Sequence, residues 1–284
     1  MIAYFNGQFL PKEEVKISPD DRGFLFADGV YEVIHAYGGK PFKMDEHLKR
    51  LARSLKEIRI DLPDVEKLGT VGEKLIVMNN PGKAEYTSLY IQVTRGVALR
   101  KHAFPKEPVS PTVYISATSG VSQKEKIARG VKIILVPDIR WHRCDIKSIS
   151  LLPNVLANQQ AKEAAAEEAV FVRDGILTEG SHTNFFTVFD GQVLTHPLNN
   201  HILPGITREI IVELCCDLKI PFREEFVHEK DLLKAKEIFI SGTSVEVTPV
   251  IQVDDGVVGN GLPGPISRKL QAAYKKMLDE FAQS

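Results

Sequence analysis

Three short segments of the chain carry residue types that can act together on one cofactor. Lys147 follows a Cys-Asp-Ile run, Glu179 lies in a later Thr-Glu-Gly-Ser run, and residues 205–207 (Gly-Ile-Thr) open an expected helix. A lysine amine forms a Schiff base with an aldehyde, and a carboxylate keeps a pyridine nitrogen protonated. The first amides of a helix bind phosphate. In this order, the three segments predict a site for pyridoxal phosphate.

Each of these residues also has an ordinary structural explanation. Most lysines are solvated surface groups, Glu179 suits a turn after a strand, and Thr207 suits a plain helix N-cap. Lys147 differs from a surface lysine because the apolar residues 131–136 read as a buried strand leading into it and a helical stretch follows it. The combination therefore favours a catalytic Lys147.

Further candidate ligands lie in basic and small-residue segments. Arg100 and His102 share a loop after an expected strand at residues 88–93. A guanidinium binds a carboxylate through two parallel hydrogen bonds, and an imidazole adds a donor, so this pair suits a substrate α-carboxylate. An exposed basic turn has the same composition. Arg50 is a candidate charged clamp for a phosphate, and the small residues 241–244 are a candidate second cradle.

Strand hairpins alternate with helices along the chain, which predicts an α+β fold rather than a regular parallel array. Apolar stripes predict a helix near residues 48–58 with Asp45 as its N-cap, an Ala-rich helix after Pro153, a helix after Thr207 and a last helix from Pro265. Hairpin turns are expected at four dipeptides: Asn6-Gly7, Gly38-Gly39, Asp174-Gly175 and Asp190-Gly191.

Composition and charge restrict the class of protein. A polar stretch at residues 119–130 predicts a linker between an N-terminal α+β domain, 1–118, and a C-terminal domain, 131–284. The formal net charge of −1 argues against nucleic acid as a partner, and no apolar run is long enough to span a membrane. The first residues do not read as a secretory signal, and three cysteines form no disulfide or zinc pattern. We expect no metal site and a cytoplasmic location.

These residues also resemble a known family, the fold-type IV pyridoxal-phosphate aminotransferases, and within it the D-amino acid aminotransferases. The resemblance runs nearly end to end. It rests on these motifs: Asp21-Arg22-Gly23, Asp28-Gly29-Val30-Tyr31-Glu32-Val33, Glu46-His47 with Arg50-Leu51, Arg140-Trp141, Arg143-Cys144-Asp145-Ile146-Lys147-Ser148, Thr178-Glu179-Gly180-Ser181 with Asn184, Gly205-Ile206-Thr207-Arg208, and Glu246-Val247-Thr248-Pro249-Val250.

The resemblance implies a two-domain fold with pyridoxal phosphate at the domain interface, and a role for each matching residue. Lys147 would form the Schiff base and Glu179 would pair with the pyridine nitrogen. Leu203 would pack on the ring, and Arg140 is a weaker candidate near the phenolate oxygen. The phosphate would be held by Arg50, Ile206, Thr207 and Thr243, with Ser244 a less certain addition.

The resemblance further implies transamination between a D-amino acid and a 2-oxo acid, for example D-alanine and 2-oxoglutarate giving pyruvate and D-glutamate. Tyr31, Arg100 and His102 resemble the carboxylate trap of the D-amino acid enzymes, whose loop enters the neighbouring subunit's site, so a homodimer is implied. His182 and Gly242 depart from the pattern, since hydroxyl residues are usual there, and His182 is a candidate substrate contact. Alternatives are an (R)-amine or branched-chain transaminase, an aminodeoxychorismate lyase, or a non-enzymatic ligand-binding protein.

Overall fold

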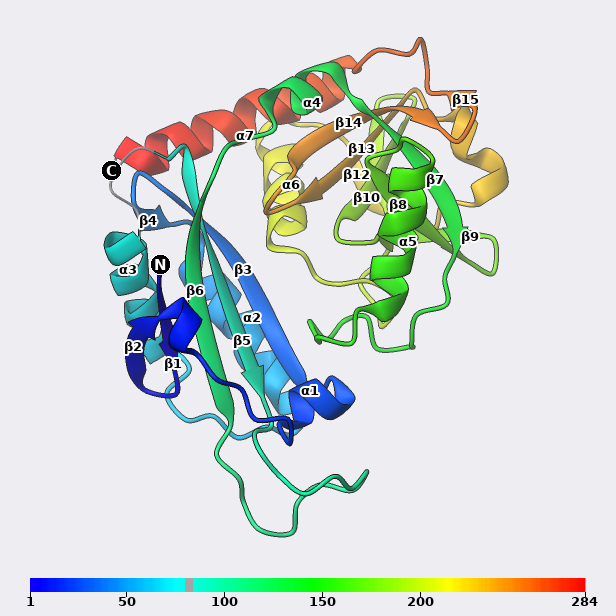
Figure 1. Cartoon of the computed structure of the whole chain (residues 1–284). Coiled ribbons are helices and arrows are strands. Elements are labelled where there is room, and N and C mark those ends of the chain that lie inside the picture. The colour runs from blue at the N-terminus through cyan, green and yellow to red at the C-terminus, as the bar shows by residue number, and fades with distance from the viewer. Residues whose placement is uncertain (80–83, 284) are drawn as a thin grey trace. The chain divides into compact units, whose positions relative to one another are not determined.

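The structure is a computed structural model that describes residues 1–79 and 84–283 (Figure 1). The chain divides into two compact units. The first comprises Met1–Ser122, Ile146–Ser150 and Phe281–Ser284, and the second comprises Gln123–Asp145 and Leu151–Glu280. Residues 80–83 and 284, which fall inside the two expected domains, lie outside the described part. The segment around Lys147 therefore belongs to the first unit, although the second unit surrounds it in sequence.

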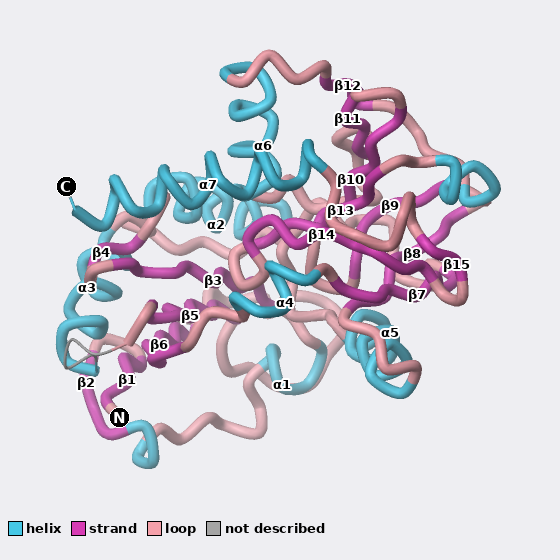
Figure 2. The backbone as a smooth tube through the Cα atoms, turned by 90° about the horizontal axis from the view of Figure 1, so that it is seen from above, coloured by secondary structure: helices cyan, strands magenta, loops and turns pink. Residues whose placement is uncertain are grey.

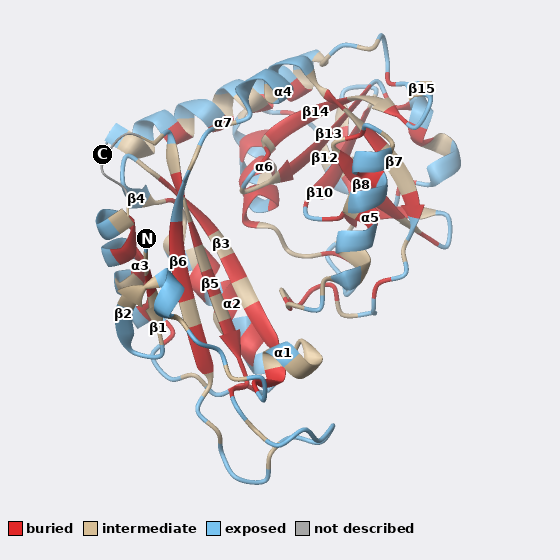
Figure 3. Cartoon of the chain, viewed as in Figure 1, coloured by how far each residue is buried: buried red, intermediate tan, exposed pale blue. Residues whose placement is uncertain are grey.

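The first unit is built on a six-stranded antiparallel sheet in the order β2-β1-β6-β5-β3-β4. Alternation along β5 buries Leu89, Ile91 and Val93 on the face that α2 and α3 cover, and leaves Tyr90 and Gln92 on the other. Figure 3 colours the buried parts of this sheet red. Its elements are β1 (Ile2–Phe5), β2 (Gln8–Pro11), a 3-10 turn (Lys12–Glu14), α1 (Arg22–Phe26), β3 (Gly29–Tyr37), β4 (Lys40–Pro41), α2 (Met44–Glu57), α3 (Lys67–Asn79), β5 (Tyr86–Thr94) and β6 (Thr112–Gly120).

The second unit contains a nine-stranded mixed sheet in the order β12-β11-β10-β13-β14-β7-β8-β9, with β15 paired to β14. In Figure 2 the helix α5 lies beside β7 and β8. Its elements are α4 (Lys124–Arg129), β7 (Val131–Pro137), α5 (Leu152–Glu163), β8 (Glu168–Arg173), β9 (Ile176–Gly180), β10 (Asn184–Phe189), β11 (Gln192–Thr195), α6 (Ile206–Asp217), β12 (Phe222–Glu224), a 3-10 turn (Glu229–Lys234), β13 (Glu237–Gly242), β14 (Glu246–Val253), β15 (Gly256–Val257) and α7 (Pro265–Gln283).

The four predicted hairpin turns are confirmed, and each joins two neighbouring antiparallel strands. Both residues of every turn have positive φ, for example +46° at Asn6 and +96° at Gly7. Such turns match the right-handed twist of the strands they join. The helix that begins at Pro265 is confirmed as well.

One predicted helix start is wrong by two residues. The residue at the N-cap of α2 is Lys43, with φ of +57°, so Asp45 lies inside the first turn, where its charge still suits the helix dipole. The predicted opening of a helix at residues 205–207 is confirmed, with Gly205 at the N-cap of α6 and Thr207 in its first turn. The range 119–130, expected to be a linker, contains the end of β6 and the helix α4.

Candidate active site

The segment that carries Lys147 is fixed by backbone hydrogen bonds to the start of β3 in the first unit. Its backbone carbonyl accepts a hydrogen bond from the Tyr31 amide at 3.0 Å, and the Ile149 amide donates to Gly29 at 3.1 Å. The Lys147 Nζ atom lies 4.5 Å from the centre of the Tyr31 ring. A Cβ on Gly29 would lie 2.6 Å from the Val93 carbonyl oxygen and 3.0 Å from Ile149, so glycine permits this close approach.

A buried charge cluster lies in the same unit. Glu32 on β3 accepts hydrogen bonds at 2.8 Å from both Nε and Nη2 of Arg50, and its Oε2 lies 2.7 Å from Nδ1 of His47. Although burial opposes ionisation, Arg50 and His47 lower the pKa of Glu32 to about 2. Burial lowers the pKa of His47, and the charges of Arg50 and Lys147 act in the same direction. Glu32 therefore sets the position of Arg50, the candidate phosphate ligand.

The loop with Arg100 and His102 is exposed, and Arg22 binds its backbone. Nη1 of this buried arginine donates to the Lys101 carbonyl at 2.7 Å. Arg100 and His102 both lie against the Phe26 ring, at 5.3 and 5.5 Å from its centre. Among the described residues, neither contacts Tyr31, so the first unit does not bring the three predicted carboxylate ligands together.

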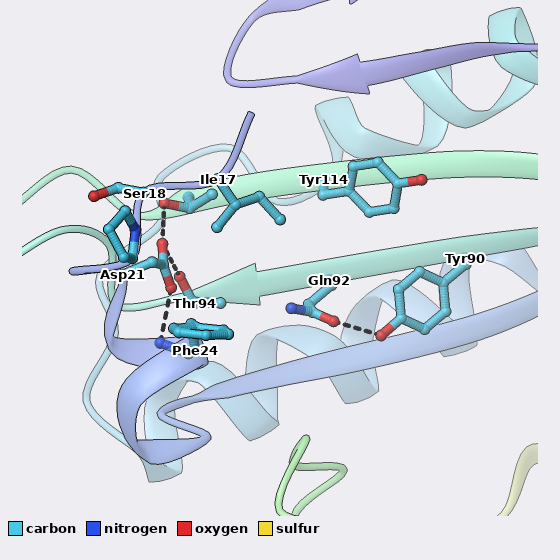
Figure 4. A pocket seen from close by; sticks show the side chains of 11 residues that line it. Ile17, Ser18, Asp21, Phe24, Tyr90, Gln92, Thr94 and Tyr114 are labelled. Carbon is cyan, nitrogen blue, oxygen red and sulfur yellow. Dashed lines mark hydrogen bonds between the residues drawn. The ribbon is translucent and has the colours of Figure 1, made fainter. Parts of the chain in front are cut away.

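The face of the first unit's sheet opposite α2 and α3 holds a pocket with a volume of about 480 Å³ (Figure 4). Tyr90, Gln92 and Tyr114 line it from the strands, and Tyr90 Oη donates to Gln92 at 2.6 Å. The rings of Tyr31 and Tyr90 are 5.8 Å apart, so Tyr31 neighbours this pocket. Phe24, another lining residue, is 74% exposed. The sheet therefore presents an aromatic, open surface here.

Glu179 is buried at the end of β9 in the second unit. Its Oε1 accepts from Nη1 of Arg140 at 2.5 Å, and its Oε2 accepts from the Leu203 amide at 2.9 Å and from Asn184 Nδ2 at 3.3 Å. Burial raises the pKa of Glu179, while Arg140 and the Leu203 amide oppose that rise. An ionised carboxylate has about four acceptor sites, so three donors leave capacity for one more.

The Arg140 side chain also binds a second acid through two of its nitrogens. It binds Asp138 through Nε and Nη2, both at 2.9 Å, and Asp138 also pairs with Arg173 at 3.1 Å. These two arginines lower the pKa of Asp138, although its burial opposes them. Asp138 therefore holds Arg140 beside Glu179, and the expected place of Arg140 near the phenolate oxygen stays a prediction.

The start of α6 lies beside Glu179's partners. Leu203 accepts a hydrogen bond from Asn184 at 2.9 Å, and a Cβ on Gly205 would lie 2.0 Å from Asn184 Oδ1. Only glycine fits at this N-cap. Thr207, in the first turn, is buried and hydrogen-bonds the Tyr274 side chain of α7.

The small-residue segment predicted as a cradle begins at the end of β13. Ser241 opposes Asn184 across the β10–β13 pair, and its Oγ is buried with no hydrogen-bond partner among the described residues. Gly242 ends the strand, and Thr243 and Ser244 follow in a turn, half-buried and exposed respectively. The second unit thus brings Glu179, the helix start and this segment to neighbouring strand ends.

The predicted site residues therefore divide between the two units. Tyr31, Arg50, Arg100, His102 and Lys147 belong to the first. The second contains Glu179, His182, Leu203, Ile206, Thr207, Thr243 and Ser244.

Sequence reasoning missed four residues that position this machinery: Glu32 beneath Arg50, Asp138 beside Arg140, Glu168 beside His182, and Tyr274 beside Thr207. Acidic residues in apolar strand sequence, as at Glu32 and Glu168, were the available signal, because an unpaired buried acid is costly.

In residues 1–79 and 84–283 no helix has the length and apolar character needed to cross a membrane. The same part of the chain contains no group of three or more His, Cys, Asp or Glu side chains that could hold a metal ion.

Comparison with known proteins gives consistent results for sequence and fold. The D-alanine aminotransferase of Staphylococcus haemolyticus is 43% identical over 98% of this chain and 98% of its own length. The Bacillus licheniformis D-alanine aminotransferase is 40% identical over 100% of both chains. Among solved structures, the branched-chain amino acid aminotransferase of Escherichia coli has a TM-score of 0.87 and 26% identity over 98% of this chain and 94% of that one.

A model of the family described as amino-transferase class IV matches residues 29–253, which span most of both units. The predicted α+β, fold-type IV architecture is confirmed by the solved relatives. This chain belongs to the class IV aminotransferase family.

Proposed function

We propose that this aminotransferase uses pyridoxal phosphate to exchange an amino group between a D-amino acid and a 2-oxo acid, such as D-alanine and 2-oxoglutarate. The observation that carries the proposal is the 43% identity to a D-alanine aminotransferase over 98% of both chains. The branched-chain enzymes share the fold at only 26–28% identity. The trap residues Tyr31, Arg100 and His102 favour the D-amino acid reading over the branched-chain, (R)-amine and lyase alternatives.

The residues of the second unit fit the cofactor. Glu179 is ionisable, buried and able to accept one further hydrogen bond, as a protonated pyridine nitrogen requires. The orphaned Ser241 Oγ and the first turn of α6, with Ile206 and Thr207, offer donors for a phosphate. In the proposal Thr243, Ser244 and Arg50 add to this phosphate site, and Leu203 packs on the ring.

When bound, pyridoxal phosphate supplies an aldehyde carbon for amine exchange and a ring that accepts electrons from the substrate Cα. The Lys147 amine would hold the cofactor, then take the substrate α-proton and return it to the carbon that the cofactor's aldehyde supplies. Proton transfer by a positioned base contributes about 10²–10⁴-fold to the rate. Glu179 would keep the proton on the ring nitrogen. His47 and Glu32 would hold Arg50 in place.

The substrate α-carboxylate is assigned to Arg100 and His102 together with Tyr31. Since the first unit does not join them, we propose a homodimer in which the loop of one copy completes the site of the other. The open aromatic face beside Tyr31, with Phe24 74% exposed, and the 81% exposure of Leu99 support a partner there. We further propose that the enzyme works in the cytoplasm, where its three cysteines stay free thiols.

Half-reaction spectroscopy tests the proposed function. Purified protein loaded with pyridoxal phosphate should show a visible band that D-alanine converts to that of the amine form, while L-alanine and L-leucine leave it unchanged. Lys147→Ala should lose both the band and turnover. Conversion by L-leucine alone, or retention of activity in the variant, would contradict the proposal.

Arg100→Ala tests the assigned carboxylate contact. Loss of one partner of a desolvated charge pair costs on the order of 2 kcal/mol or more, so kcat/KM for D-alanine should fall at least about 30-fold. Lys101→Ala, one residue along the same exposed loop, is the matched control and should change it less than about twofold. The trap is wrong if an amine without a carboxylate loses as much activity as D-alanine.

A further inference from the structure

His182 sits at the apex of the turn between β9 and β10 in the second unit. The turn is closed by a 2.7 Å hydrogen bond from the Gly180 amide to the Thr183 carbonyl, directly after Glu179. The His182 carbonyl lies 3.5 Å from the position that a Cβ on Gly242 would take. His182 therefore lies between the two segments proposed to bind the ring nitrogen and the phosphate.

A buried carboxylate holds this histidine. Glu168 on β8 has no exposed side-chain surface, and its Oε2 lies 2.9 Å from Nδ1 of His182. Its other contacts are the Ser181 hydroxyl at 2.5 Å, the Thr183 hydroxyl at 2.9 Å and the Ala169 amide at 2.8 Å. Burial acts to raise the pKa of Glu168, but the His182 ring and these donors bring it below its usual value. These contacts therefore favour the ionised form of Glu168.

The ionised Glu168 favours the imidazolium form of its partner. Burial acts to lower the pKa of His182, but Glu168 outweighs it and the pKa lies above its usual value. Of the other charged groups that face the ring, Glu167 acts with Glu168, and Lys162 of α5 opposes them. At neutral pH this combination favours a positive charge on the ring.

One ring nitrogen of His182 remains available. Glu168 and the Ser181 hydroxyl, at 3.1 Å, both contact Nδ1, whereas Nε2 has no partner among the described residues. The side chain is 44% exposed, in contrast to fully buried Glu168. A fixed imidazole with a free N–H donor is suited to an oxyanion. A substrate carboxylate and the cofactor phosphate are the two possible sources of such an anion.

We propose that His182 binds the side-chain carboxylate of an acidic amino acid or 2-oxo acid, and so gives the enzyme a preference for dicarboxylic substrates. The inference rests on the function proposed above. The α-carboxylate is assigned to Arg100 and His102, and the phosphate has the α6 start, Ser241 and Thr243. The second carboxylate of substrates such as glutamate or aspartate is the anion that lacks an assigned partner.

The test compares two unreactive acids on the holoenzyme. The binding constants of glutarate and butyrate are measured from the change in the cofactor's visible absorption, for the wild type and for His182→Gln. Loss of a hydrogen bond from a charged donor should weaken glutarate at least about tenfold and butyrate less than about twofold. The kcat/KM ratio of D-glutamate to D-alanine should fall by a similar factor. His228→Gln, which changes an exposed histidine elsewhere in the second unit, should alter neither.

The outcomes separate this inference from the proposed function. Equal or unchanged binding of the two acids in His182→Gln would overturn the assignment to substrate. A variant whose only defect is weaker binding of pyridoxal phosphate to the apoenzyme would assign His182 to the phosphate instead. Wild-type protein that fails to bind the cofactor or to turn over D-alanine would refute the proposed function and the inference with it.

The protonation of the ring gives a second readout. In the wild type, glutarate should bind less tightly as the pH rises through the His182 pKa, and NMR of the imidazole should report the same transition. The pH dependence should be lost in His182→Gln. A ring that titrates below pH 6 in the holoenzyme would contradict the imidazolium that the proposal needs.

Discussion

Two buried glutamates, one in each unit, have opposite electrostatic surroundings. Glu32 receives hydrogen bonds from both Nε and Nη2 of Arg50. Glu179 receives a single contact from Arg140, whose Nε and Nη2 bind Asp138 instead. The pKa of Glu32 falls to about 2, whereas burial raises that of Glu179.

The difference separates a structural acid from a chemical one. The charge of Glu32 is compensated within the protein, so its contribution is to hold Arg50 and His47. Glu179 shares its cation, which leaves it prepared to stabilise a positive group from outside, as a protonated pyridine ring would be. Substitutions at the two sites should therefore affect different properties.

Glu179→Gln should give the largest change. It removes the acceptor that holds the ring proton, and we expect kcat to fall by about 10³-fold or more, toward the upper range for a proton-handling group. The free energy of unfolding should change by only about 1 kcal/mol, because Arg140 retains its ion pair with Asp138. Steady-state kinetics at saturating cofactor and urea unfolding measure the two. If the variant unfolds far more easily but keeps its kcat, the distinction between the two acids fails.

Glu32→Gln should give the opposite pattern. It leaves Arg50 buried without its carboxylate, and removal of one partner of a buried ion pair costs about 3–5 kcal/mol. The urea midpoint should drop sharply, while kcat at saturating pyridoxal phosphate falls less than about tenfold. Glu73→Gln, at an exposed position of α3 in the same unit, is a control whose stability should stay close to that of the wild type. A stable, inactive Glu32→Gln enzyme would reverse the assignment.

The sequence predicted those parts of the fold whose cause is local. The Asn6-Gly7 and Asp174-Gly175 turns are encoded by residues that tolerate positive φ, and the last helix begins at the proline that predicted it. The start of α2 was misjudged because Lys43 takes a left-handed conformation, which side-chain preference does not favour there.

The reactive residues of the candidate site could be predicted from the sequence, but the contacts that hold them in position could not. Lys147 and Glu179 were found from their residue types and order. That Lys147 joins the first unit depends on its bond to Tyr31, more than a hundred positions away in the chain, which no local pattern encodes. Likewise, the contact of Arg140 with Glu179, 39 positions further along the chain, is not encoded by any local pattern.

The smallest expected effect is the pH dependence of the stability that ionised Glu32 contributes. The folded pKa of Glu32, about 2, lies below its ordinary value of 4.5. Its contribution is therefore complete above pH 4.5 and is lost as the pH falls from there toward 2. The shift corresponds to on the order of 3 kcal/mol. Urea unfolding of the wild type and Glu32→Gln between pH 6 and 3 isolates this acid, since the other carboxylates titrate in both. Their difference should shrink as the pH falls, and a constant difference would mean that Glu32 is not held ionised by Arg50.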